Sequence, residues 1–475
     1  MTEQDVATQS AEAAPSLRAL ISTRIGILAL ALLTIEAIAG MQASVTATVT
    51  PLMAADFGAQ RYYGLVEGAP LAATFLTMPL GSRLLGRVPA GRLLGIFTVV
   101  TVVGGLISAT APGVAVFATG RVVSGLAAGA LATVSMSALI TAMPRRWRQM
   151  VLAGYSAMWV ITSLIGPAYA AWISATVGWR WSLVAYLPFL VLARLVVAHQ
   201  LPREPIGRAE DSFGFRGAVV LAAAVAVTTL TALLHTPWSV LIALAALIVG
   251  VLAAAPMLPA GVLCARPGRP AAISVLGLLT GVYFGASAVV TILAHDLLQF
   301  SVGQIGVLLL AGGLGWAVTG VFTARRPAIG PAYRRRGALG ITLLVVGLAV
   351  MWIAVAFPTS PALYIAAWTV AGVGMGLVYL DTINAVVEEP AVPDGISPVA
   401  AGSATVVVEQ SATALAGTAV ATAVAALLTS NANPGMVAVP LLILIAAALL
   451  VPFGLSRVIR QPTTHAETGH PAPAS

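Results

Sequence analysis

Glu36, Arg121, Asp381 and Glu409 are ionisable side chains that lie inside long apolar runs of this 475-residue chain. A charge held inside a lipid bilayer costs about 2.5–3.5 kcal/mol, so such a residue needs a partner, a water-filled cavity or a function. Glu36 lies roughly 11 residues into its run, which places it near the bilayer midplane. A carboxyl group there favours its neutral form and could bind and release a proton. A purely structural, hydrogen-bonded Glu36 is the alternative.

The other three charges allow similar pairs of interpretations. Arg121 could compete with a proton for a nearby carboxylate, or it could bond backbone carbonyls across a helix bundle. Asp381 follows a run of closely spaced glycines that favours helix packing, so it could respond to water or support the fold. Glu409, followed by Gln410 and Ser411, could bind a cationic substrate or a proton. All four are candidates for proton coupling.

The apolar runs that hold these residues are long enough to cross a membrane, which takes about 20 residues in a helix. Turn-forming pairs such as Pro112-Gly113 separate neighbouring runs. The sequence therefore predicts an all-α integral membrane protein with about 14 transmembrane helices. The runs lie near residues 25–51, 64–82, 93–111, 114–142, 150–174, 181–199, 215–235, 238–258, 271–295, 302–324, 337–357, 361–387, 400–429 and 436–458.

The predicted spans form two groups of six with two further helices between them. Two similar bundles are typical of transporters built from internal repeats, which alternate access by rocking one bundle against the other. We expect a cytoplasmic tail at 1–24, an N-terminal six-helix bundle at 25–199, a cytoplasmic linker at 200–214, two intervening transmembrane helices at 215–258, a C-terminal six-helix bundle at 259–458 and a cytoplasmic tail at 459–475.

The composition excludes most other classes of protein. Hydrophobic residues make up 59% of the chain and charged residues 8%, against about 45–50% and about 25% in soluble domains. All 24 basic residues are arginines, which excludes lysine-dependent phosphate loops and Schiff-base chemistry. The single Cys264 cannot form an internal disulfide or a cysteine-based zinc cluster. Because no hydrolase or metalloprotease motif is present either, we expect no enzyme activity, no cofactor and no metal.

The arginines also predict the orientation of the chain. Twenty of them fall in one set of loops and at the chain ends, whereas only Arg61 and Arg180 fall in the opposite set. Cytoplasmic loops carry the excess of basic residues, so we expect a multi-pass plasma-membrane protein with both termini in the cytoplasm. The formal net charge of +8 then reflects topology and not nucleic-acid binding. We expect Glu67, His295 and Asp296 to lie at solvated outer edges.

Several phrases of the sequence resemble motifs of the major facilitator superfamily, most closely its fourteen-helix drug:proton antiporter branch. The end of the first span, from Gln42 to Pro51, is similar to the D-x-T-[IV]-V-A-T-A-L-P motif of that branch. Arg121-Val122-Val123-Ser124-Gly125 resembles the R-x-x-x-G motif, and the resemblance implies a role for Arg121 in proton coupling. Gly166-Pro167 and the later Trp179-Arg180-Trp181 look like the antiporter Gly-Pro motif and its following W-R-W. The resemblance covers nearly the whole chain.

The loop after the second span resembles the gating motif G-x-L-x-D-R-x-G-R-R through Gly81, Arg83 and Arg87. The resemblance implies a gating role for these residues and for Gly166 and Pro167. The chain departs from the family at acidic positions, since Gln42 and Leu85 stand where the motifs carry Asp. The carboxylate for proton antiport must therefore come from elsewhere in the chain, or the coupling is absent.

Aromatic residues within the spans are candidates for the wall of a substrate cavity. We include Gln42, Tyr155, Trp159, Tyr283 and Trp316 in that wall. The alternative is that these rings face lipid or pack between helices.

The predicted function is export of small hydrophobic or cationic molecules in exchange for protons by alternating access. The expected partners are such a substrate, protons and the lipid bilayer, with the protein a monomer. Transport of a lipid or glycolipid by the same fold is the main alternative. A membrane sensor that transports nothing and binds a partner on its arginine-rich loops is a third.

Overall fold

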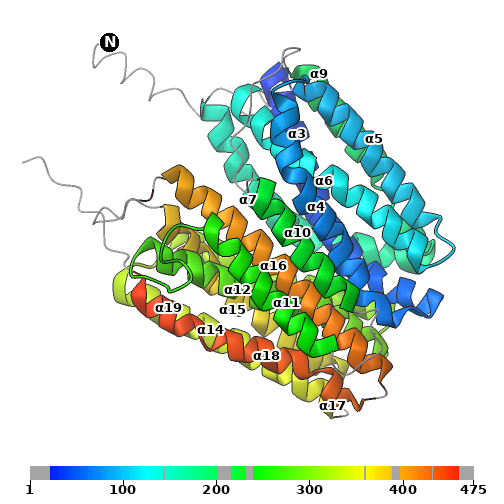
Figure 1. Ribbon diagram of the computed structural model, residues 1–475, viewed down its shortest axis with the longest axis vertical. Helices are drawn as coiled ribbons and strands as arrows, with labels where there is room; N and C mark the ends of the chain where they lie inside the picture. Colours follow the sequence, from blue (N-terminus) through cyan, green and yellow to red (C-terminus); the bar gives the residue numbers. More distant parts are fainter. Residues whose placement is uncertain are drawn as a thin grey trace, which may run out of the picture.

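Long α-helices dominate the chain in the computed structural model, which describes residues 22–142, 145–201, 215–231, 239–357, 360–387, 396, 398–430 and 432–458 (Figure 1). Within these residues ten helical stretches are long and apolar enough to cross a membrane. The predicted all-α membrane architecture is therefore confirmed. The other four predicted spans correspond to helices that are shorter, less apolar or described only in part, so the count of fourteen remains a prediction.

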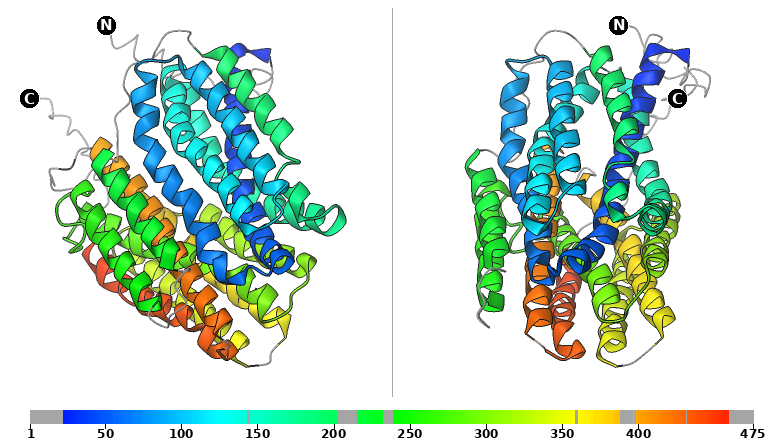
Figure 2. Two further views of the ribbon diagram at one scale, coloured as in Figure 1. Left: turned by 45° about the vertical axis from the view of Figure 1, so that its right-hand side comes forward. Right: turned by 90° about the vertical axis from the view of Figure 1, so that its right-hand side faces the viewer.

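The first group of helices comes from the N-terminal half of the chain (Figure 2). It comprises α3 (Arg24–Phe57), η1 (Gln60–Tyr62), α4 (Tyr63–Leu85), α5 (Ala90–Ala109), α6 (Val114–Ala142), α7 (Arg145–Thr176), α8 (Trp179–Ser182) and α9 (Leu187–Gln200). We call the end where α3 begins the terminal end, and the end where α3 stops the distal end.

The second group comes from the C-terminal half and packs beside the first, green through red in Figure 2. It comprises α12 (Arg269–Asp296), α13 (Val302–Arg325), α14 (Gly330–Ala356), α15 (Pro361–Val387), α16 (Pro398–Thr429), α17 (Pro434–Val437), α18 (Val439–Ala448) and α19 (Val451–Arg457). Between the groups in sequence lie α10 (Phe215–Leu230), α11 (Ser239–Ala254) and η3 (Ala255–Met257).

Glycines let the helices of each bundle approach closely. A Cβ atom on Gly372 of α15 would meet the backbone of Gly312 on α13, and one on Gly374 would meet the backbone of Gly340 on α14. Close backbone approach through small residues is the usual mode of helix association in membranes, where lipid removes the hydrophobic drive. The glycine run that precedes Asp381 is therefore a packing surface, as the sequence indicated.

Helix ends follow local signals. Thr23 caps the start of α3, and Gly58, with a φ of 59°, ends it in the left-handed region. Ser301 and Gln304 form a reciprocal capping box at the start of α13. The last predicted span is broken into α17, α18 and α19, each of which has a proline in its first turn.

The two bundles contact each other along their distal halves. Across this seam, Tyr63 donates a hydrogen bond to Asp296 at 2.7 Å, and Thr291 donates one to the carbonyl of Ala47 at 2.7 Å. Gly64 of α4 lies against Thr422 of α16. We call these contacts the distal seam.

Helix α10 packs against both bundles and bridges them on one side (Figure 1). One apolar cluster joins Phe75 and Met78 of α4 to Leu221 and Val225 of α10 and to Leu415 of α16. Arg83 at the terminal end of α4 also lies over the ring of Phe215, 4.8 Å from its centroid. The helix therefore follows the α4–α16 boundary along most of its length.

Candidate functional site

Arg121 and Glu67 face each other inside the N-terminal bundle. Helices α4 and α6 are in close contact because Gly125 lies against the backbone of Pro70. Glu67 and Arg121 stand about one turn before this contact on parallel helices, so they lie at matching heights. They interact electrostatically, and the buried Nε atom of Arg121 has no hydrogen-bond partner in the described part of the chain. The expectation of a solvated edge is therefore wrong for Glu67.

A polar network continues from Arg121 toward α3. Gln42 donates a hydrogen bond through Nε2 to the hydroxyl of Tyr186 at 2.9 Å. Tyr186 is buried, with 9% of its surface exposed, and interacts electrostatically with both Arg121 and Arg194. Arg194 in turn donates to Thr101 of α5 at 3.1 Å. Gln42 therefore lies next to the network around Arg121, although its side chain is not acidic.

Two charged residues of this network, Glu67 and Arg194, were absent from the sequence-based candidates, as was Tyr186. Arg194 could have been found because it interrupts the predicted span at 181–199. Glu67 lies only five residues into its helix, where height alone suggests the membrane surface. Its partner on α6 distinguishes it, and no feature of the sequence reveals that partner.

Glu36 is half-buried on α3 and has an interaction partner. Its helix packs against α7, where Gly40 meets Thr162 and Gly166 meets Ser44. Pro167 is buried beside Gly166, and its carbonyl lies near Gly306 of α13. The Gly-Pro pair therefore stands where α7 contacts both bundles. The side chains of Tyr155 and Trp159, also on α7, lie outside the described residues.

The C-terminal bundle contributes a carboxylate beside aromatic rings. Glu409 of α16 is half-buried, interacts with the phenol of Tyr379 on α15, and has a buried Oε1 without a hydrogen-bond partner among the described residues. Tyr379 meets Trp316 edge-on at 5.5 Å between ring centroids, and Trp316 meets Tyr283 at 5.4 Å. Tyr283 is only 4% exposed and stacks on Trp368. Trp316 and Tyr379 are therefore the more accessible rings, and the buried Tyr283 packs against Trp316.

Asp381 lies in a different environment at the terminal end of α15. Its side chain is 1% exposed and pairs with Arg336 of α14 at 2.9 Å. The second carboxylate oxygen accepts the backbone N–H of Ala328 at 3.1 Å, and Arg336 also donates to the carbonyl of Arg326. Asp381 thus holds the connection between α13 and α14 and is separate from the rings around Glu409.

The loop after α4 uses its residues mainly for packing and anchoring. Leu85, at the position where the resembling motif carries Asp, is 0% exposed in an apolar cluster with Leu28, Leu93 and Leu131. Gly81 is buried, Arg83 lies over Phe215, and Arg87 is exposed. A carboxylate at position 85 would be buried among aliphatic side chains.

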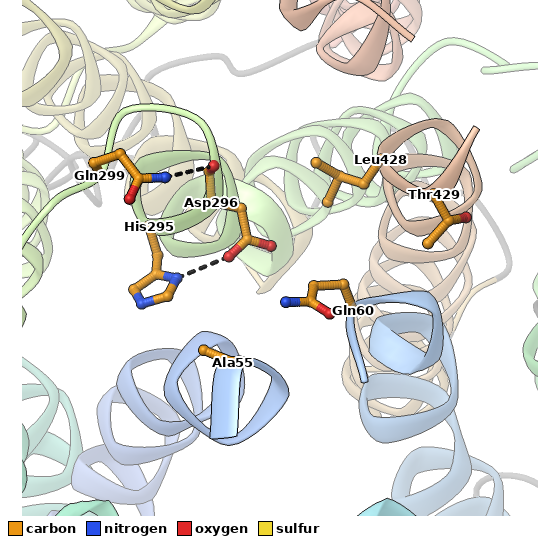
Figure 3. A pocket seen from close by; sticks show the side chains of 7 residues that line it. All are labelled: Ala55, Gln60, His295, Asp296, Gln299, Leu428 and Thr429. Atoms are coloured by element: carbon orange, nitrogen blue, oxygen red, sulfur yellow. Dashed lines mark hydrogen bonds and ion pairs between the residues drawn. The ribbon is translucent and has the colours of Figure 1, made fainter. Parts of the chain in front are cut away.

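The distal seam contains a pocket of about 370 Å³ (Figure 3). His295 and Asp296 of α12 point toward each other in it, with 2.8 Å between Nδ1 and Oδ1. The Asp296 side chain is 9% exposed and also accepts the Tyr63 hydroxyl, so a solvated edge is wrong for it as well. The remaining lining residues are Ala55, Gln60, Gln299, Leu428 and Thr429.

The chain forms two helix bundles, and both contain interior charges. A family model also matches most of the chain. The model of the Major Facilitator Superfamily matches residues 32–417. The chain belongs to the Major Facilitator Superfamily. Members of this superfamily transport solutes. The chain is therefore placed among transporters.

Curated relatives of this superfamily member are efflux proteins at low identity. The chain is similar to the "MFS-type efflux pump LUC4" of Fusarium sp, with 26% identity over 222 residues, which cover 45% of this chain and 39% of the pump. It is also similar to the "Probable multidrug-efflux transporter Rv1634" of Mycobacterium tuberculosis, with 28% identity over 137 residues, 29% of each chain. The matches thus span well under two thirds of either relative.

Solved transporters share the fold over nearly the whole chain. A POT family transporter in complex with 5-aminolevulinic acid has a TM-score of 0.63 at 12% identity, covering 90% of this chain and 95% of that one. A bacterial homolog of the human lysosomal transporter Spinster, in an inward-facing and occupied conformation, has a TM-score of 0.62 at 13% identity, with 92% and 98% covered. These similarities establish the fold.

Proposed function

We propose that this superfamily member exports small hydrophobic or cationic molecules in exchange for protons by alternating access. The efflux relatives support the direction of transport, and the paired bundles support the mechanism. The arginine-rich terminal end faces the cytoplasm in this proposal, because Arg83, Arg87, Arg266 and Arg457 gather there. With the distal seam closed, the two bundles would then separate on the cytoplasmic side.

The observation that carries the proposal is the carboxylate Glu409 beside Tyr379 and Trp316. An organic cation is attracted both by a carboxylate and by the faces of aromatic rings, and a desolvated cation–π contact contributes about 2 kcal/mol. A proton on Glu409 removes the negative charge and so weakens cation binding. Substrate and proton thereby exclude each other at one side chain.

The proposal also includes the other candidate residues for proton coupling, and the topology, location and oligomeric state of the protein. Arg121 takes part in proton coupling, Glu36 is a further candidate, and Asp381 contributes through its pair with Arg336. Fourteen spans, the six-plus-two-plus-six division, a plasma-membrane location with cytoplasmic termini and a monomeric state complete it. In this count α4, α7, α10 and α11 supply the four spans beyond the ten long apolar helices.

The test is efflux of ethidium from export-deficient cells that express the protein, with and without a protonophore. Low accumulation that rises when the proton gradient collapses is the expected result. Glu409→Gln should abolish this difference, whereas Asp56→Asn, which alters an exposed pair at the distal end, should keep it. Wild-type efflux by Glu409→Gln would contradict the assignment. Absence of dye efflux together with transport of labelled lipid in proteoliposomes would favour the lipid alternative.

A further inference from the structure

Helix α3 carries Gln42 near Arg121 and supplies no carboxyl group at that position. The Gln42 side chain is an amide that donates to Tyr186 and cannot take up a proton near neutral pH. Tyr186 connects it to Arg121 through an electrostatic interaction. The arginine site is therefore built on this side from neutral polar groups.

Arg121 also interacts electrostatically with a carboxylate, that of Glu67 on the neighbouring helix α4. Within the described residues no hydrogen bond or ion pair within 4 Å joins the two, and the Nε atom of Arg121 stays unpartnered. A structural ion pair inside a membrane protein would be expected to close to hydrogen-bond distance, since unpaired charge there is costly. Within the described residues the carboxyl group of Glu67 is therefore not held in a closed ion pair with Arg121, which is compatible with a group that alternates between a charged and a neutral form.

Few other charged groups face Glu67. On α6 the facing charge is Arg121. The residues of α10 and α16 that meet α4 at this height are threonines, Thr229 and Thr418, both against Gly68. One turn toward the distal end stands Tyr63, bonded to Asp296 of α12. Arg121 is therefore the charged group that acts on Glu67 from the neighbouring helices.

We propose that Glu67 is a second carboxyl group, besides Glu409, that binds and releases a coupled proton, and that it stands in for the acid that α3 lacks at Gln42. The inference rests on the proposed proton-coupled export. A proton from the distal side adds to a carboxylate oxygen of Glu67 and makes the carboxyl group neutral. Arg121 then keeps only its electrostatic interaction with Tyr186. Loss of that proton toward the terminal end restores the negative charge and the attraction between α4 and α6. Because Glu67 lies one turn from the distal seam, its charge can influence whether that seam opens.

The test compares two transport modes in proteoliposomes that contain purified protein and ethidium. Glu67→Gln should lower transport driven by a pH gradient by about tenfold or more, since the coupling between proton and substrate is lost. Exchange of dye down its own gradient, without a pH gradient, should stay within about twofold, since Glu409 and its rings are intact. Full pH-driven transport by Glu67→Gln would overturn the inference.

Two further variants keep the test decisive. Glu67→Asp keeps a carboxylate and should retain pH-driven transport with a shifted pH midpoint, and an unchanged midpoint would count against Glu67. The double variant Gln42→Glu with Glu67→Gln moves the carboxylate to the other side of Arg121, and partial recovery of pH-driven transport is expected. If wild-type protein moves dye without any response to a pH gradient, proton-coupled export itself fails. If transport responds equally to a pH gradient in wild type and in Glu67→Gln, only the assignment of Glu67 fails, and proton-coupled export stands.

Discussion

The carboxylate of Asp381 accepts hydrogen bonds from Arg336 and from the backbone of Ala328 while almost fully buried. Removing one partner of a buried pair leaves an uncompensated charge, which costs about 3–5 kcal/mol. Asp381→Asn should therefore lower the melting temperature of the detergent-purified protein markedly. The exposed pair of Asp56 and Arg180, with 40–46% of each side chain accessible, provides the control. Asp56→Asn should cost about 0–1 kcal/mol, and equal losses in both variants would refute the distinction.

At the residue scale the sequence identified some of the interior charges but not Arg194, and it did not show which charges meet. Arg121, Asp381 and Glu409 lie on helices in the interior of their bundles, as their positions in apolar runs indicated. Glu67 was misplaced because the height of a residue in its span says nothing about the direction in which its side chain points. That direction depends on how α4 is rotated against α6, and the Gly125–Pro70 contact sets this rotation.

At the element scale, glycine positions make a specific prediction about helix packing. A Cβ atom on Gly125 would collide with the backbone of Pro70, whereas nothing lies within 4 Å of one on Gly95. Gly125→Ala should destabilise the protein by about 1–3 kcal/mol through overpacking. Gly95→Ala should be neutral or slightly stabilising, because alanine favours helix by about 1 kcal/mol. Thermal unfolding in detergent compares the two, and a stable Gly125→Ala variant would show that α4 and α6 can separate at no cost.

The boundaries of the elements were predicted well where composition changes sharply. The spans at 114–142 and 361–387 agree with α6 and α15 at both ends. Helix α14 begins at Gly330 and not near residue 337, because its first turns carry arginines that extend out of the apolar run. The breaks inside the last span lie just before Pro440 and Pro452, which stand in the first turns of α18 and α19, and hydrophobicity alone does not predict these breaks.

At the scale of the whole molecule, the distal seam must open for alternating access. A Cβ atom on Gly306 would lie 2.6 Å from that of Ala171 in the other bundle. In a Cys264→Ser background, the pair Ala171→Cys and Gly306→Cys should cross-link under oxidation and stop transport, with recovery after reduction. The matched control is Gly281→Cys with Ala412→Cys, 3.5 Å apart between Cβ positions within one bundle.

The control cross-link joins α12 to α16 inside a single bundle and is expected to leave transport nearly unchanged. Disulfides need Cβ atoms about 3.5–4.5 Å apart, so the first pair requires a small outward shift of α7 or α13. Transport that continues at full rate with the seam demonstrably cross-linked would rule out rocking of the two bundles about this contact. The two-bundle plan was expected from the order of the spans, but which faces meet depends on side-chain contacts such as Tyr63 with Asp296.

The position of α10 along the boundary of α4 and α16 has a consequence for molecules dissolved in the lipid. A solute that diffuses in the plane of the bilayer meets a continuous apolar wall on that flank, closed by Leu221 and Val225 against Phe75 and Leu415. Sideways admission from the hydrocarbon phase is therefore blocked on that flank at the level of this cluster. The two flanks thus differ within the plane of the membrane, because at the other boundary α7 contacts α13 directly, with Gly306 against Ala171.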